Sequence, residues 1–98
     1  MDMNYKELED ISELLKVIAH PVRLCIIKGL VENEGCNVSH MQECLGLPQS
    51  TVSQHLQKLR AYGIIEGQRS GSEVFYKVCD KKIASIVKAI MQIDKLAL

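Results

Sequence analysis

The tripeptide Gly46-Leu47-Pro48 constrains the fold of this 98-residue chain most, because it forms a tight turn between two segments of helix length. Before the turn, residues 38–45 are predicted to form a short helix, and Asn37 can cap its start. After the turn, residues 49–62 are predicted to form a second helix, which Gly63 ends in a left-handed conformation. Two helices joined by so short a turn have the layout of a helix-turn-helix motif.

The helix predicted over residues 49–62 has an apolar side and a polar side. Val52, Leu56 and Leu59 recur at helical spacing and form the apolar side. The opposite side carries Gln49, Ser50, Ser53, Gln54 and Lys58. Compact polar side chains suit a helix that enters the major groove of DNA, about 12 Å wide, because glutamine can pair with adenine and serine can contact base edges or phosphates. Helix capping and simple exposure to solvent are the alternative explanation for the serines.

Further elements surround this motif in the pattern of a winged helix. Helices are predicted at residues 5–19, 21–32 and 80–95, and strands at residues 64–67 and 74–78. The element order is α-α-α-α-β-β-α, so the fold class is mainly α with a small β-hairpin. We expect one domain over residues 1–98, in which residues 38–62 form the helix-turn-helix and residues 63–78 form the wing. Arg69, at the hairpin tip, can reach a flanking minor groove or the DNA backbone.

The formal net charge of the chain is zero, which taken alone argues against a nucleic-acid partner. The charges are nevertheless unevenly divided. Residues 1–47 have a net charge of −4 and residues 48–98 a net charge of +4, so the half with the polar helix and the hairpin is basic. No run approaches the roughly 20 apolar residues of a membrane span, and the acidic N-terminus is unlike a signal peptide. We therefore expect a cytoplasmic protein with no membrane partner.

Two segments carry a more specific pattern. They read Ile18-Ala19-His20-Pro21-Val22-Arg23-Leu24 and Leu45-Gly46-Leu47-Pro48-Gln49-Ser50-Thr51-Val52-Ser53-Gln54-His55-Leu56. Together with Leu59-Arg60 and the segment 71–78, they resemble the ArsR/SmtB family of repressors over residues 8–90, and residues 47–56 look like its PagR-type members. The resemblance implies a winged helix-turn-helix homodimer that represses transcription by binding an imperfect inverted repeat in double-stranded DNA.

The resemblance also implies which residues contact DNA. The recognition-helix positions of the family fall on Gln49, Ser50, Thr51, Ser53, Gln54 and His55. Phosphate or backbone contacts are expected from Lys58, Arg60 and, in the wing, Arg69. A structural hydrogen bond is the alternative role of His55. Pro48 departs from the family pattern, because many relatives have a serine there that caps the helix, so we expect Gln49 or Ser50 to cap instead.

The terminal helices carry apolar stripes that the helix-turn-helix core does not need. The stripes consist of Leu8, Ile11, Leu15 and Ile18 in segment 5–19 and of Ile83, Ile86, Ile90 and Ile93 in segment 80–96. Such a face must be buried against another element. Pairing both terminal helices across a two-fold axis would bury it, and the family resemblance implies the same homodimer. Two recognition helices would then lie about 34–36 Å apart, one turn of DNA.

Many relatives bind metal ions, so the corresponding positions decide whether this chain can. The Cys-x-Cys pair of the third helix falls on Asn37 and Ser39, which are not soft ligands. The ligand positions of the last helix fall on Asp80, Lys82, Ile93 and Leu96. A single carboxylate does not hold zinc, so we expect no metal and no cofactor. An unconventional site that uses Cys36, His40 or Cys79 is the alternative.

The four cysteines are expected to be reduced in the cytoplasm. Cys25 and Cys44 lie in apolar helices and are predicted to be small core residues. Cys36 lies in a loop and Cys79 where the wing meets the last helix, which makes these two the candidate reactive thiols. A thiol- or redox-responsive repressor is therefore an alternative to one that has no ligand and is controlled by its own abundance.

Two other classes of function are the alternatives to a DNA-binding repressor. A winged-helix module that binds proteins is compatible with the neutral charge and the acidic first helix. An enzyme is not expected, because the sequence has no glycine-rich phosphate loop and no nucleophile motif. Ser53 and His55 point about 200° apart on a helix and cannot act as a nucleophile and its base.

Overall fold

The computed structural model describes residues 4–33 and 35–96, and it confirms a mainly helical fold with a small antiparallel β-sheet. In chain order, the elements are α1 (Tyr5–Ile18), α2 (Pro21–Asn33), β1 (Cys36–Asn37), α3 (Val38–Leu45), α4 (Gln49–Ala61), β2 (Ile65–Ser70), β3 (Glu73–Val78) and α5 (Lys81–Leu96). The helix bounds agree with the sequence patterns to within one residue. Within the described ranges, no helix combines the length and apolar composition that crossing a membrane would require.

Strand β1 is the element that the sequence patterns did not predict. It pairs with β3 in antiparallel register, Cys36 opposite Tyr76 and Asn37 opposite Phe75, which gives the sheet order β1-β3-β2. A two-residue strand has no periodicity from which it could be recognised. The β2–β3 hairpin is also longer than predicted, because most of the expected tip at residues 68–72 belongs to the strands. Gly71, with φ 66°, stands in the turn between them.

The helix-turn-helix is fixed by the residues at its helix ends. Asn37 caps α3 as predicted, because its side-chain oxygen accepts a hydrogen bond of 2.8 Å from the backbone N–H of His40. Gly46 ends α3 and Gly63 follows α4, with φ values of 66° and 71° that glycine adopts without strain. Asn37 and Gly46 thus define the two ends of α3, and Gly63 lies just beyond the end of α4.

One hydrophobic core lies where α2, α4, the sheet and the start of α5 meet. Its largest fully buried side chains are Ile27, Val52, Leu56, Leu59, Ile64 and Ile83. The predicted apolar side of α4 is therefore confirmed. The terminal helices contribute more than expected, because Ile18, Ile83 and Val87 belong to this core. Ile83 is only 1% exposed, so it packs within the protomer and not on a dimer surface, which corrects the prediction.

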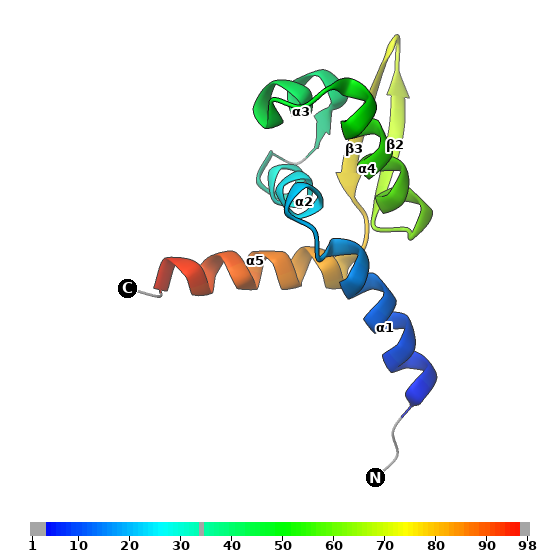
Figure 1. Ribbon diagram of the computed structural model, residues 1–98, viewed down its shortest axis with the longest axis vertical. Helices are drawn as coiled ribbons and strands as arrows, with labels where there is room; N and C mark the ends of the chain where they lie inside the picture. The colour runs from blue at the N-terminus through cyan, green and yellow to red at the C-terminus, as the bar shows by residue number, and fades with distance from the viewer. Residues whose placement is uncertain (1–3, 34, 97–98) are drawn as a thin grey trace.

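The remaining parts of α1 and α5 extend away from this core. Figure 1 shows the two terminal helices leaving it in different directions, while the β2–β3 hairpin projects from the opposite end of the molecule beside α4. The molecule is elongated, with extents of 52 × 36 × 21 Å. The helix-turn-helix and its wing thus lie at one end, and two protruding helices lie at the other.

Candidate nucleic-acid interface

Helix α4 presents a polar face outward because its apolar residues all point into the core. Gln49, Ser50, Gln54 and Lys58 are exposed, and Ser53 is half-buried at the edge of this face. Gln57 is also exposed on it, one helical turn beyond Gln54, and sequence reasoning missed it. Its position in the 3.6-residue period was the signal that could have identified it. The face is thus lined by amides and hydroxyls, which can both donate and accept hydrogen bonds.

The first turn of α4 is not capped by a side chain. Pro48 occupies the N-cap position, and its carbonyl accepts hydrogen bonds of 3.1 Å from the backbone N–H groups of Thr51 and Val52. The expectation that Gln49 or Ser50 would replace the missing cap was wrong. Both side chains are therefore available to a ligand. The uncapped N-terminus also carries the positive end of the helix dipole, which favours a phosphate.

Basic side chains surround the polar face of α4. Lys58, Arg60 and Arg69 are all exposed, Arg69 on strand β2 opposite Val74 near the hairpin turn. None of them takes part in the ion pairs found within residues 4–33 and 35–96. The Lys58 ammonium lies 5.3 Å from the centre of the Tyr62 ring, a cation–π contact that orients it. These charges remain available for an anionic partner.

His55 points toward α2 and not outward with the glutamines. Its Nδ1 lies 3.4 Å from Nη1 of Arg23, and its ring centre lies 4.7 Å from that of His20. Burial lowers the pKa of His55, and the neighbouring His20 and Arg23 lower it further because they disfavour a second positive charge. This arrangement matches the alternative role of His55 as a structural hydrogen-bonding residue.

Apolar side chains are exposed on both terminal helices. Leu8 and Leu15 of α1 are 46% and 41% exposed, and Ile90 of α5 is 56% exposed. Ile11 and Ile86 are half-buried and line an apolar hollow of about 480 Å³ between the two helices. The side chain of Ile93, the last of the predicted contacts, lies outside the described residues. Leaving such a surface in water is unfavourable, so a partner is expected to cover it.

Three of the four cysteines differ in accessibility from the prediction, whereas Cys79 is exposed at the junction of the wing and the last helix. Cys25 and Cys44, predicted in the core, are exposed. Other faces of their helices pack into the core. Cys36, predicted in a loop, is 8% exposed because β1 packs into the sheet. No group of three or more ligands that could hold a metal ion occurs in the part of the chain that the structure describes.

The structure does not bring Cys36 and Cys79 together. Cys36 lies opposite Tyr76 in the sheet, and Cys79 follows Tyr76 by three residues. Three residues of extended chain span about 10 Å, whereas the Cα atoms of a disulfide lie within about 7 Å. These two thiols therefore cannot form a disulfide within one protomer unless the backbone moves.

The chain is similar to known regulators in sequence. A protein-family model described as a helix-turn-helix domain matches residues 18–68. The chain is 42% identical to the transcriptional repressor PagR of Bacillus anthracis, over 94% of this chain and 92% of that protein. It is 44% identical to the HTH-type transcriptional repressor SmtB of Mycobacterium tuberculosis, over 82% of this chain and 58% of that protein.

The fold is similar to solved structures as well. The crystal structure of PagR of Bacillus anthracis superposes with a TM-score of 0.81 at 42% identity, covering 89% of this chain and 99% of that chain. The crystal structure of the transcriptional repressor BigR from Xylella fastidiosa superposes with a TM-score of 0.79 at 36% identity, covering 91% of this chain and 87% of that chain. The similarity to these repressors in sequence and in fold thus covers nearly the whole chain.

Proposed function

The chain belongs to the ArsR/SmtB family of winged helix-turn-helix transcriptional repressors, and we propose that it represses transcription as a homodimer on an inverted-repeat operator. DNA binding follows from the family. The dimer, the symmetry of the operator and the residues that contact it are the parts that we propose. Since its partner is DNA and its relatives are transcription regulators, we propose the cytoplasm as its location and assign it no enzyme activity.

Base recognition is assigned to the outward face of α4. Exposed Gln49, Ser50 and Gln54, with Ser53 and Thr51 at the edges, lie in the first half of the helix, the half that contacts base edges in helix-turn-helix proteins. We add Gln57 to this set because it shares the same face. The missing side-chain cap supports the assignment, since the side chains of Gln49 and Ser50 are not used for a capping hydrogen bond.

Phosphate contacts are assigned to the basic residues around α4. Lys58 and Arg60 follow the base-reading half of the helix, and Arg69 lies on the hairpin that projects beside it (Figure 1). Their freedom from ion pairs within the described residues supports this role. His55 is assigned an indirect role: it orients α4 against α2 through His20 and Arg23.

The dimer interface is assigned to the exposed apolar faces of α1 and α5. Leu8, Ile11, Leu15, Ile86 and Ile90 form it, with Ile93 expected at its far end and Ile83 behind it in the core. The exposure of large apolar side chains on two protruding helices supports this assignment. An isologous dimer formed in this way presents two copies of α4, which requires an operator with two-fold symmetry.

The single observation that carries the proposed recognition is the uncharged polar face of α4, and Gln54→Ala tests it. We expect this variant to lose about tenfold in affinity for operator DNA selected from inverted repeats, because a bidentate glutamine contact contributes about 1–3 kcal/mol of discrimination. Binding to random DNA should hardly change. Gel retardation with both DNAs, at one fixed salt concentration, gives the comparison.

Gln92→Ala is the matched control, because Gln92 is an exposed glutamine on α5, away from α4. It should bind both DNAs as the unaltered protein does. An equal loss of specific and non-specific binding in Gln54→Ala would contradict base reading by this residue. Failure of the unaltered protein to retard any DNA would instead favour a protein-binding module.

A further inference from the structure

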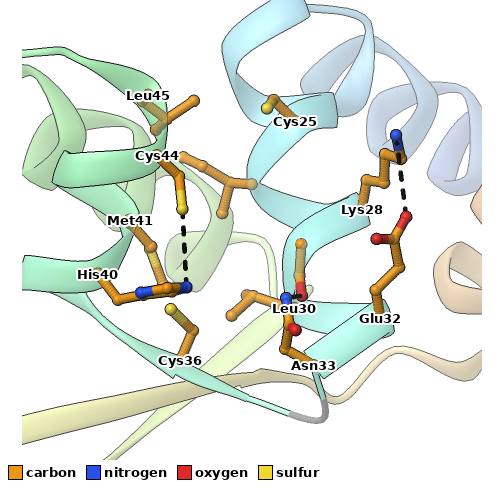
Figure 2. A pocket seen from close by; sticks show the side chains of 12 residues that line it. Cys25, Lys28, Leu30, Glu32, Asn33, Cys36, His40, Met41, Cys44 and Leu45 are labelled. Carbon is orange, nitrogen blue, oxygen red and sulfur yellow. Dashed lines mark hydrogen bonds and ion pairs between the residues drawn. The ribbon is translucent and has the colours of Figure 1, made fainter.

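Three of the four cysteines and a histidine line a cavity between α2 and α3. Its volume is about 200 Å³. Cys25 reaches it from α2, Cys36 from β1, and His40 and Cys44 from α3. The rest of the lining is largely apolar and includes Ile26, Leu30, Met41 and Leu45. Figure 2 shows the Cys44 thiol and the His40 ring facing each other on the α3 side, with Cys25 on the α2 side.

Cys44 and His40 form a pair of nucleophile and base. The Cys44 sulfur lies 3.6 Å from Nε2 of His40, one helical turn away on the same face of α3. The imidazole can take the thiol proton and leave a thiolate, which is the reactive form of cysteine. Cys44 lies in the last turn of α3, where the helix dipole does not stabilise an anion. The thiolate therefore depends on His40.

The other thiols lack this arrangement. Cys36 is buried and donates a hydrogen bond of 3.3 Å to the carbonyl of Asn37, and burial raises its pKa. Cys79 is exposed and donates one of 3.3 Å to the carbonyl of Gly63, and burial of its sulfur raises its pKa as well. Among the cysteines in the described part of the chain, only Cys44 has an imidazole nitrogen within hydrogen-bonding distance.

We propose that Cys44 is a covalent modification site for small, soft carbon electrophiles, of which enones are the type, that enter the cavity between α2 and α3. The apolar lining suits a short carbon chain better than a charged or strongly hydrated reagent. His40 removes the thiol proton, and the sulfur adds to the β-carbon of the enone. A carbon–sulfur bond forms, the carbon–carbon π bond breaks, and the α-carbon takes the proton from His40. The addition needs no oxidant or reductant.

An adduct at Cys44 has a route to the DNA-binding surface. It would fill the space between α2 and α3, and α3 contacts α4 directly across the helix-turn-helix. A group that separates α3 from α2 therefore changes the position of α4 relative to the core. Modification is expected to weaken DNA binding, and this part of the inference rests on the proposed function.

Methyl vinyl ketone, a small enone, is the probe that tests the site. The full chain is treated near neutral pH, and the adducts are located by intact-mass and peptide-mass measurement over time. Cys44 should react about tenfold faster than Cys79, which is the internal control for an exposed thiol. His40→Gln should slow the reaction of Cys44 about tenfold and leave Cys79 unchanged, since glutamine cannot accept the proton.

Equal rates at Cys44 and Cys79 would overturn the proposal, and so would an unchanged Cys44 rate in His40→Gln. Circular dichroism of His40→Gln verifies that the variant is folded. This readout does not depend on DNA, so it tests the site even if the proposed operator binding fails.

The regulatory consequence is tested separately by operator binding. Treated protein should bind operator DNA about tenfold more weakly than untreated protein, and Cys44→Ser should be unaffected by the same treatment. If the adduct forms at Cys44 and the affinity for DNA stays the same, regulation through this site is wrong. If treated Cys44→Ser also loses affinity for operator DNA, the effect comes from another thiol.

Discussion

His55 turns toward α2, although it belongs to the same helix as the outward-facing glutamines. Its neighbour Arg23 also donates a hydrogen bond from Nε to the carbonyl of Val17, near the end of α1. His20 accepts a hydrogen bond of 3.1 Å at Nδ1 from the backbone N–H of Val22, at the start of α2. The cluster of His20, Arg23 and His55 therefore connects α1, α2 and α4. His55 is the member of this cluster that belongs to α4.

The lowered pKa of His55 predicts a pH dependence of stability. Because the folded protein holds this pKa below its ordinary value of 6.5, the unfolded chain binds more protons in mild acid. The stability is therefore fully present above about pH 6.5 and is lost as the pH falls through the lowered pKa. Urea unfolding between about pH 7.5 and pH 5 should show a shallower dependence for His55→Gln than for the unaltered protein.

Gln92→Ala, which changes no titratable group, is the control for this comparison. It should retain the pH dependence of the unaltered protein between those limits. A His55→Gln protein whose stability falls just as steeply would exclude His55 as its source.

Two glycines in different elements predict opposite responses to an added methyl group. A Cβ on Gly67 of β2 would lie 2.9 Å from Cε1 of Tyr76 and 3.0 Å from Cγ1 of Val74, whereas a Cβ on Gly29 of α2 meets nothing within 4 Å. Gly67→Ala should therefore lower the free energy of unfolding by about 1–3 kcal/mol. Gly29→Ala should raise it by about 0.5–1 kcal/mol, because alanine favours a helix.

Chemical denaturation of the two glycine variants measures both effects on one scale. A neutral Gly67→Ala would mean that the Tyr76 ring gives way without cost. A destabilised Gly29→Ala would mean that the middle of α2 needs the flexibility of glycine.

Sequence patterns predicted the elements with regular spacing and failed where long-range packing decides. The stripe of Val52, Leu56 and Leu59 predicted the buried side of α4, and the glycines on either side of the helix predicted its bounds, because both signals are local. Strand β1 forms only because β3 passes beside it. Whether Ile83 lies in the core or at a surface depends on where α5 crosses α2, which no local pattern contains.

The candidate site shows the same division between local and non-local information. The outward-facing polar residues of α4 followed from the helical period, and the same period would have identified Gln57. The inward turn of His55 depends on Arg23 and His20, 32 and 35 positions earlier in the chain. The contact between Cys44 and His40 is one helical turn long, yet its exposure depends on how α3 packs against α2.

At the scale of the whole molecule, function is divided between its two ends. The end with α4 and the wing carries Lys58, Arg60 and Arg69, and the other end carries the exposed apolar faces of α1 and α5 (Figure 1). A net charge of zero thus conceals the basic surface that we propose binds DNA and the apolar surface that we propose binds a second protomer. Neither surface is complete in one chain, because an inverted repeat needs two copies of α4.

Ile90→Asp tests the proposed dimer. Ile90 is 56% exposed in the protomer, so aspartate should leave the fold intact while it places a charge in the apolar interface. We expect light scattering to give about half the mass of the unaltered protein, and operator affinity to fall more than tenfold.

Gln92→Asp carries the same new charge on α5, at an exposed position that does not line the hollow between α1 and α5, and it should remain a dimer that binds the operator. An Ile90→Asp protein that remains dimeric would exclude this face as the interface. Circular dichroism of both variants separates loss of the dimer from loss of the fold.

The protrusion of α1 and α5 from the core affects how the repressor responds to its own concentration. Each protomer has its own core, so we expect free protomers to exist in solution before they pair. In the proposed dimer, the concentration of the DNA-binding species rises with the square of the protomer concentration whenever most of the protein is unpaired. Operator occupancy then rises from low to high over a narrow range of synthesis rates. Two helices that extend beyond the core would thus give a small repressor a threshold in its own concentration for occupying the operator.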